Sequence, residues 1–235
     1  MNAHSFVNRQ DLNRQWLPMP RKNQKRLVPV KLVPGRASKQ SERSLRASAN
    51  YKAKQGDYKS AIALLTQLIS RNPADAISYN NRGLVYFQTG QREKALADYN
   101  RALQLNPELD SAYNNRANYY ASSGKLAEAL TDYEQALDLN PANIRTWINQ
   151  AITFRELGLY DLALENLDMA LILGCLEGHI YAERGRTYHL RGDWNCAIAD
   201  YQRALQELPP SGTTANRLRH KVENWMSHLL KPLSA

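Results

Sequence analysis

Residues 79–107 read YNNRGLVYFQTGQREKALADYNRALQLNP, and this stretch decides the fold. Aromatic and small residues stand at helical spacing on both sides of Gly90, and Pro107 closes the stretch. Glycine returns every 34 residues, and an alanine five positions later keeps the same period. These residues are Gly56, Gly90, Gly124, Gly158 and Gly192, and Ala61, Ala95, Ala129, Ala163 and Ala197. A period of this length indicates units that bury their apolar faces by stacking on one another.

Alignment on the glycines predicts five repeats of two helices each: 42–75, 76–109, 110–143, 144–177 and 178–211. Proline ends four of the five repeats because it cannot continue a helix interior. In the fourth repeat Gly174 and Cys175 stand at this place, so we expect a looser or bent junction there. Behind the repeats, apolar residues spaced by four, three and four predict a capping helix within 212–235, on which they form one stripe: Leu218, Val222, Trp225 and Leu229.

The order aromatic, small residue, aromatic, Gly, Ala, aromatic, Ala and Pro resembles the tetratricopeptide repeat (TPR) family, of the bacterial or organellar type. The resemblance covers about 170 of the 235 residues. It implies an all-α fold, a right-handed α-solenoid of five TPR helix pairs with a C-terminal capping helix. It also implies a non-enzymatic scaffold whose concave face, lined by the first helix of each repeat, binds protein partners, in a larger complex.

The chain carries a net charge of +9, and its distribution is uneven. Residues 1–46 hold 11 basic and 2 acidic residues, a net of +9, so the remaining 20 basic and 20 acidic residues cancel. Basic charge and four prolines predict a disordered arm over residues 1–41. Without an apolar run of about 18 residues we expect no membrane span, and the unpaired Cys175 and Cys196 indicate free thiols. The expected location is the cytoplasm, or the interior of an organelle if the arm is a targeting segment.

The arm combines basic pairs with apolar anchors, a pattern that favours docking on a partner. The expected docking residues are Trp16, Arg21, Lys22, Lys25, Arg26, Leu27, Val28, Leu32 and Val33. Three alternatives remain: a solvated tail with incidental apolar residues, an arm that occupies its own groove, and an arm that contacts nucleic-acid phosphates. The nucleic-acid interpretation is the weaker one, because the arm has no aromatic series for base stacking.

Within the repeats, an Arg and an Asp recur 16 positions apart. The pairs are Arg82–Asp98, Arg116–Asp132 and Arg184–Asp200, and in the fourth repeat both members change together to Gln150 and Asn166. Because the swap keeps the hydrogen-bonding capacity, we predict cross-helix contacts inside each repeat and no ligand site.

The resemblance places one position of each first helix on the concave face, and Asn81, Asn115 and Asn149 occupy it in three successive repeats. An amide offers a donor and an acceptor to an extended peptide backbone, so we expect a peptide-binding strip. Other residues expected to extend this strip are Asn80, Asn114 and Asn118, and a more basic end is formed by Arg145, Arg155 and Arg186, near His179 and His189. The alternatives are solvated or locally capping asparagines and ordinary surface charge.

The sequence lacks the residues that chaperone-tail binding, zinc binding or catalysis would require. The carboxylate clamp that some family members use on chaperone tails is incomplete, since Ser111 and Asn115 replace two basic residues. The spacing of Cys175, His179, His189 and Cys196 does not fit a zinc motif. No phosphate loop or catalytic motif occurs, so we expect no cofactor, no small-molecule substrate and no enzymatic activity. The two remaining hypotheses are a protein-binding adaptor or assembly factor, and a ribonucleoprotein-associated factor.

Overall fold

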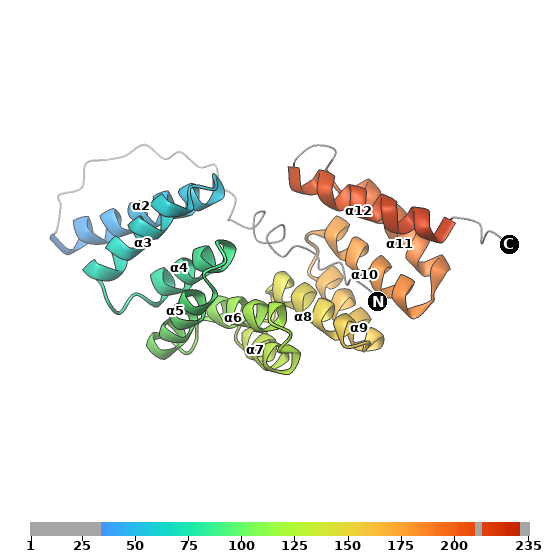
Figure 1. The fold of residues 1–235 in the computed structure, drawn as a ribbon, viewed down its shortest axis with the longest axis horizontal. Coiled ribbons are helices and arrows are strands. Elements are labelled where there is room, and N and C mark those ends of the chain that lie inside the picture. Colours follow the sequence, from blue (N-terminus) through green and yellow to red (C-terminus); the bar gives the residue numbers. More distant parts are fainter. Residues whose placement is uncertain (1–33, 210–212, 231–235) are drawn as a thin grey trace. The chain divides into compact units, whose positions relative to one another are not determined.

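The computed structural model describes residues 34–209 and 213–230, and side chains from Ser41 onward except for those of 210–215. This part of the chain contains eleven helices and no strand (Figure 1). Two compact units divide between Leu109 and Asp110. The helices of the N-terminal unit are α2 (Pro34–Lys54), α3 (Tyr58–Arg71), α4 (Ala76–Gln88) and α5 (Arg92–Leu105). Those of the C-terminal unit are α6 (Asp110–Ser122), α7 (Leu126–Leu139), α8 (Ile144–Glu156), α9 (Tyr160–Ile172), α10 (Glu177–Arg191), α11 (Trp194–Glu207) and α12 (Thr213–Leu230).

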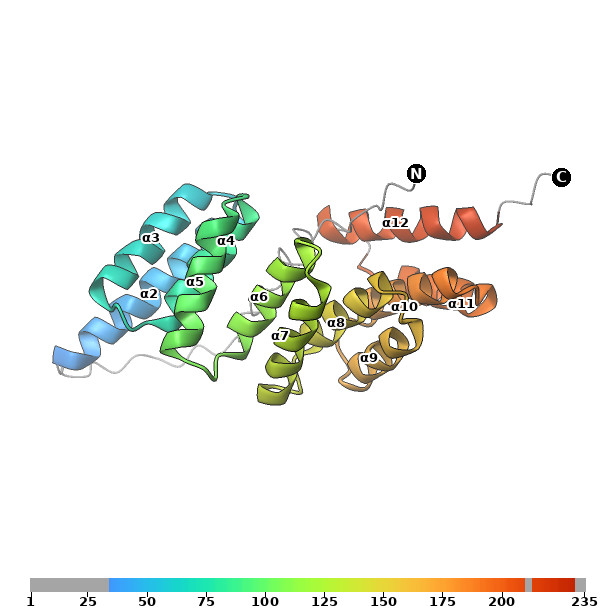
Figure 2. The ribbon, with the colours of Figure 1, turned by 60° about the horizontal axis from the view of Figure 1, so that its bottom comes forward.

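Consecutive helices pack as antiparallel pairs within each unit (Figure 2). In the N-terminal unit α2 packs on α3 and α4 on α5, with α3 against α4. In the C-terminal unit α6 pairs with α7, α8 with α9 and α10 with α11, and α12 covers α11 and part of α10. The first helices α6, α8 and α10 also contact one another in sequence. The five helix pairs and the capping helix that the sequence predicts are therefore confirmed.

The first helix begins earlier than the sequence indicates. We placed residues up to 41 in the disordered arm, but α2 begins at Pro34 and includes residues 34–41. Proline is well suited to the first helical position, where its missing N–H costs nothing. Pro34 therefore marks a helix start, whereas the sequence counts it among the four prolines that favour a disordered arm. Residues 1–33, and with them all the predicted docking residues of the arm, lie outside the described residues.

The 34-residue glycine period reflects the turn between the two helices of a repeat. Gly90 has φ of +77°, in the left-handed region that side chains disfavour, and four further glycines at this position share it. The junction after the fourth repeat has the same length as the others, since α9 ends at Ile172 and α10 begins at Glu177, but its backbone differs. Among the described residues, Leu176 alone has a positive φ without being glycine, at 67°.

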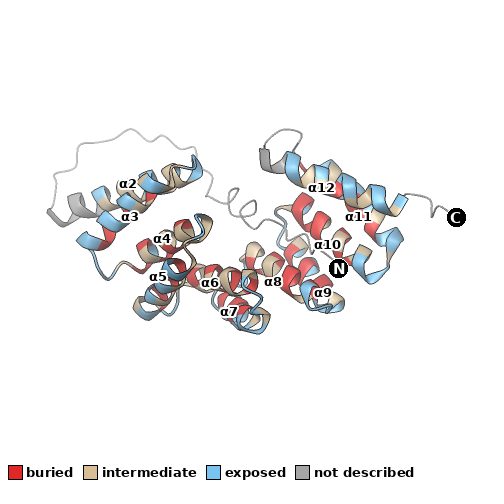
Figure 3. Cartoon of the chain, in the orientation of Figure 1, coloured by how far each residue is buried: buried red, intermediate tan, exposed pale blue. Residues whose placement is uncertain are grey.

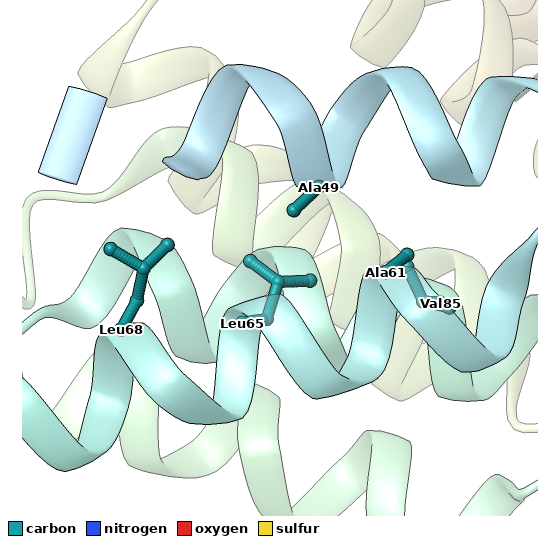
Figure 4. Close-up of a cluster of buried hydrophobic side chains, with 5 residues drawn as sticks. All are labelled: Ala49, Ala61, Leu65, Leu68 and Val85. Atoms are coloured by element: carbon teal, nitrogen blue, oxygen red, sulfur yellow. The ribbon is translucent and has the colours of Figure 1, made fainter. Parts of the chain in front are cut away.

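Small and large residues alternate where the two helices of a repeat meet, and buried positions follow the facing sides of each pair (Figure 3). A Cβ on Gly83 would lie 2.8 Å from Cε1 of Tyr99, and one on Gly185 would lie 2.7 Å from Cδ1 of Tyr201. These glycines let the backbone of the first helix approach the tyrosine ring of the second. In the first repeat, aliphatic residues fill the same space (Figure 4).

The predicted cross-helix pairs are all present. Two guanidinium nitrogens of Arg82 donate to both carboxylate oxygens of Asp98 at 2.8 and 2.9 Å. The same fork joins Arg116 to Asp132 and Arg184 to Asp200. In the fourth repeat, Nδ2 of Asn166 donates to Oε1 of Gln150 at 2.8 Å.

Aromatic rings explain why these arginines sit where they do. The guanidinium of Arg82 lies 5.6 Å from the ring centre of Tyr79 and 5.7 Å from that of Tyr86. The arginines of the third and fifth repeats lie between two tyrosines in the same way. The aromatic positions of the repeat thus hold the guanidinium flat for its bidentate contact.

Two buried tyrosines at the same repeat position differ in hydrogen bonding, which gives a matched prediction. The hydroxyl of Tyr133 donates to Oδ1 of Asn118 at 2.7 Å, whereas the buried hydroxyl of Tyr99 has no partner within the described residues. Leu84 stands in the second repeat where Asn118 stands in the third. We expect Tyr133→Phe to lower the free energy of unfolding by about 1–2 kcal/mol and Tyr99→Phe to leave it unchanged or raise it. Urea unfolding of both variants measures the contrast, and equal losses would contradict it.

Candidate functional site

The candidate binding surface consists of first-helix residues, and each unit presents its own part of it. In the N-terminal unit, Asn81 on α4 is half-buried and makes no hydrogen bond through its side chain within the described residues. In the C-terminal unit, Asn149 on α8 is half-buried as well. Its Nδ2 donates to Oδ1 of Asn114 at 3.2 Å, while its own Oδ1 accepts nothing within the part of the chain that is described. Both residues keep hydrogen-bonding capacity for a ligand.

Four asparagines of the predicted strip are buried, and one of them joins two repeats. Asn114 is 8% exposed, and its Oδ1 also accepts from the hydroxyl of Thr146 at 3.3 Å, so it joins α6 to α8. Asn118 is buried and engaged by Tyr133. Asn80 and Asn115 are buried too. The sequence placed these four residues on one polar strip with Asn81 and Asn149, but burial separates them from it.

Arg155 was expected at the basic end of the groove, and it lies in the interior. Its Nη1 is 2.8 Å from Oε2 of Glu183 and donates to the backbone oxygen of the same residue at 3.1 Å. The hydroxyl of Thr187 accepts from the same nitrogen at 3.4 Å. Both charged side chains are almost fully enclosed, at 8% and 3% exposure. The pair therefore links the fourth repeat to the fifth and is not a ligand site.

Arg145 and Arg186 remain at the edge of the surface. Arg145 lies in the first turn of α8, and its partial burial lowers the pKa of the guanidinium to about 10. The guanidinium carbon of Arg186 on α10 lies over the ring of Trp225, 5.3 Å from the ring centre. Nη1 of Arg186 lies 3.4 Å from Nδ1 of His189. The capping helix α12 thus contributes Trp225 to the place that the sequence assigned to the first helices alone.

Two histidines of this region make stability dependent on pH. Burial lowers the pKa of His179 below its usual value near 6.5, although Glu183 opposes the shift. Burial also lowers the pKa of His189, and Arg186 and His228 add to that effect. The unfolded chain therefore binds protons at a higher pH than the folded one. The stability that depends on these two neutral imidazoles is therefore present above about pH 6.5, and it is lost as the pH falls below that value toward the lowered pKa values.

We therefore expect the urea midpoint to fall between pH 7.5 and 5.5. The double variant His179→Asn, His189→Asn should show a smaller change over the same range. His220, whose side chain is 77% exposed, provides the control, because His220→Asn should keep the pH dependence of the unmodified chain. A pH dependence that survives in the double variant would contradict the assignment.

No group of three or more His, Cys, Asp or Glu side chains that could hold a metal ion is found in the described residues. Cys175 and Cys196 are both exposed, free thiols. None of the described helices is long and apolar enough to cross a membrane.

The family follows from the helix pairs together with the sequence. A model of the tetratricopeptide repeat matches residues 76–109 and 111–143, and a model described as a TPR repeat matches residues 49–90. The chain is a tetratricopeptide repeat protein. The fourth and fifth TPR units lie outside these matches, and their helix pairs and buried cross-helix contacts identify them. The TPR fold is that of a protein-interaction scaffold, and proteins of this family are generally not enzymes.

Solved structures share the TPR fold at low sequence identity. A thermophilic TPR protein from Thermus thermophilus is 20% identical with a TM-score of 0.68, over 79% of this chain and 99% of that one. MamA is 17% identical with a TM-score of 0.57, over 72% of this chain and 92% of that one. A chain of the APC/C hetero-tetramer Cut9–Hcn1 is 19% identical with a TM-score of 0.68. The match covers 77% of this chain but only 36% of that one. No curated protein matches the sequence. At these identities the likeness shows the fold alone.

The sequence did not reveal two features of the site. The position that carries Asn81, Asn115 and Asn149 is Glu183 in the fifth repeat, and the partner of Glu183 is Arg155, at a place where no other repeat has Arg or Lys. The outer face of α9 also differs from its counterparts. A comparison of each outer-helix position across the five repeats would have found it, because polar residues there become aliphatic only in the fourth.

Proposed function

We propose that the first-helix surface of each unit binds an extended segment of a partner protein through its backbone. The proposal is carried by Asn81 and Asn149, which stand at one repeat position and keep unused amide capacity toward the surface. A side-chain amide can accept from a backbone N–H and donate to a backbone carbonyl, so such recognition does not depend on the sequence of the peptide. Arg145 and Arg186 favour acidic side chains or a terminal carboxylate at their edge of the surface.

The arm has a separate role in this proposal. Its basic and apolar residues, outside the described part of the chain, dock on a second partner, so the protein acts as an adaptor between two binding reactions. Residues 1–46 carry the whole net charge of +9 and the rest of the chain is neutral overall, which gives the two reactions different salt dependence. We expect binding through the arm to weaken with salt and binding through the first helices to change little.

The test uses peptides selected from a random 12-residue display library on the full-length chain. Asn149→Ala should weaken the binding of selected peptides about tenfold, as expected for two lost hydrogen bonds in a protected site. Methylation of single backbone nitrogens of the peptide should cause a similar loss, since the contact is made to the backbone. Asn81→Ala provides the same test for peptides that bind the N-terminal unit.

Asn195→Ala on the exposed side of α11 is the matched control, because it removes the same group from an outer helix. Fluorescence anisotropy with labelled peptides gives the affinities, and circular dichroism verifies that each variant is folded. Unchanged affinity in folded Asn149→Ala and Asn81→Ala variants would refute backbone recognition by these residues.

A further inference from the structure

The outer face of α9 is apolar and exposed. Leu162, Met169 and Ile172 are 41%, 43% and 76% exposed, and they lie on one side of the helix at steps of seven and three. Leu157 and Leu159, both 44% exposed, precede the helix at its N-terminal end. Single exposed apolar residues are ordinary, but a contiguous set on one helix face marks an interaction surface. We call Leu162, Met169 and Ile172 the α9 face.

The other repeats show that this face is not required by the fold. At the place of Leu162 they carry Ser60, Lys94, Glu128 and Cys196. At the place of Met169 they carry Gln67, Arg101, Gln135 and Arg203, and at the place of Ile172 they carry Ser70, Gln104, Asp138 and Gln206. The same helix positions therefore also fold with polar side chains, so packing within the repeat does not explain the aliphatic residues of the fourth.

The surroundings of the α9 face are acidic. Residues 156–177 contain five carboxylates and no Lys or Arg, whereas the corresponding stretch of every other repeat has at least one basic residue. Asp161 and Asp168 are bound by Arg191 and Arg184 at 2.5 and 2.6 Å. Glu165 lies on the same side as the apolar residues and is exposed, and it forms no ion pair within the described residues. The face thus fits a ligand that is both aliphatic and basic.

The chain contains such a segment in its own arm. Residues 21–36, RKNQKRLVPVKLVPGR, hold six basic residues and no acidic one. Leu27 and Leu32 stand five positions apart, which in an extended chain is about 17 Å. Leu162 and Ile172 are ten positions apart on a helix, which is about 15 Å. Two aliphatic anchors can therefore lie over the two ends of the α9 face while a basic residue of the segment reaches Glu165 beside it.

We propose that the α9 face binds residues 21–36 of the arm of another copy of this chain. The inference rests on the proposed docking role of the arm and names its partner, but it does not depend on peptide binding by the first helices. The contact joins two different surfaces, so it does not close on itself as a two-fold dimer does. It produces assemblies whose size increases with protein concentration and decreases with salt.

The test separates the arm from the α9 face within the full-length chain. A chain carrying Leu27→Ser, Val28→Ser, Leu32→Ser and Val33→Ser keeps the α9 face but loses the apolar anchors of its own arm. We expect a fluorescein-labelled peptide of residues 21–36 to bind this chain in anisotropy measurements. The further changes Leu162→Ser, Met169→Gln and Ile172→Ser install the residues of the first repeat without a change in charge. These changes should weaken the binding of the peptide at least tenfold.

The matched control introduces the same three residues at the corresponding positions of the fifth repeat, through Cys196→Ser, Arg203→Gln and Gln206→Ser. It should leave the affinity for the peptide unchanged. Sedimentation velocity of the unmodified chain should show assemblies that the α9 changes abolish. Peptide affinity unchanged by the α9 changes overturns the proposal. The proposal is also overturned if the unmodified chain stays monomeric at protein concentrations well above the Kd of the peptide, because the arm then does not act between copies.

One variant distinguishes this proposal from the proposed function. Asn149→Ala should leave the binding of the 21–36 peptide unchanged, whatever its effect on library peptides. If Asn149→Ala abolishes binding of the arm peptide and the α9 changes do not, the arm occupies the first-helix surface, which overturns the assignment to α9 and supports peptide binding by Asn149.

Discussion

Arg155→Met is expected to lower the free energy of unfolding by about 3 kcal/mol. The substitution leaves the carboxylate of Glu183 enclosed without its ion-pair partner, since that side chain is 3% exposed. Methionine keeps most of the side-chain volume, so the loss reports on the missing charge and not on a cavity. Urea unfolding of the full chain followed by circular dichroism measures the change, with unfolding of the fourth and fifth repeats expected before that of the others.

The double variant Arg155→Met, Glu183→Leu is the informative comparison. Replacing both members of a buried ion pair by apolar residues of similar volume is often neutral or stabilising, so the double variant should recover most of the lost stability. Arg191→Met breaks the exposed pairs with Asp161 and Asp193 and should have a small effect. If Arg155→Met proves as mild as Arg191→Met, the buried pair does not link the two repeats energetically.

Leu65→Ala should have a comparable effect for a different reason. Leu65 on α3 is 1% exposed and packs with Ala49, Leu68 and Val85 in the core of the N-terminal unit (Figure 4). Truncation removes buried methyl groups and leaves a cavity, which costs about 2–5 kcal/mol. Because this cluster joins α2 to α3 and includes Val85 of α4, we expect loss of helicity in all three helices.

Ile77→Ala on α4 serves as the comparison, because Ile77 is 43% exposed and its truncation should change the free energy of unfolding by less than about 1 kcal/mol. Thermal and urea unfolding should agree in the order of the two variants. A loss for Leu65→Ala no larger than that for Ile77→Ala would show that the first repeat is not held by this cluster.

The sequence predicted contacts inside a repeat well, because they recur with the period. Arg82 and Asp98 have counterparts at the same spacing in two other repeats, and the joint change to Gln150 and Asn166 identified the fourth. Residues that recur with a complementary partner can be paired without coordinates. The Tyr, Gly and Ala positions can be assigned in the same way, because they recur with the period and fill the space between the two helices of a repeat.

Contacts between repeats could not be predicted in this way. Asn114 and Asn149 occupy neighbouring places of their repeats, and which of them faces the surface depends on how α6 packs against α8. Arg155 and Glu183 have no counterparts elsewhere in the array, so no periodic signal marked them as a pair. Four asparagines and one arginine that the sequence assigns to the candidate surface are therefore enclosed.

The two kinds of contact have opposite consequences for how the array can change in length. A fork such as Arg116–Asp132 lies wholly within one repeat, so duplication of that repeat copies both members together. The Arg155–Glu183 pair is divided between two repeats, and a duplication or deletion that falls between them leaves a charge enclosed alone. Gain or loss of a repeat that separates Arg155 from Glu183 should therefore be selected against, so that the fourth and fifth repeats are inherited as one piece.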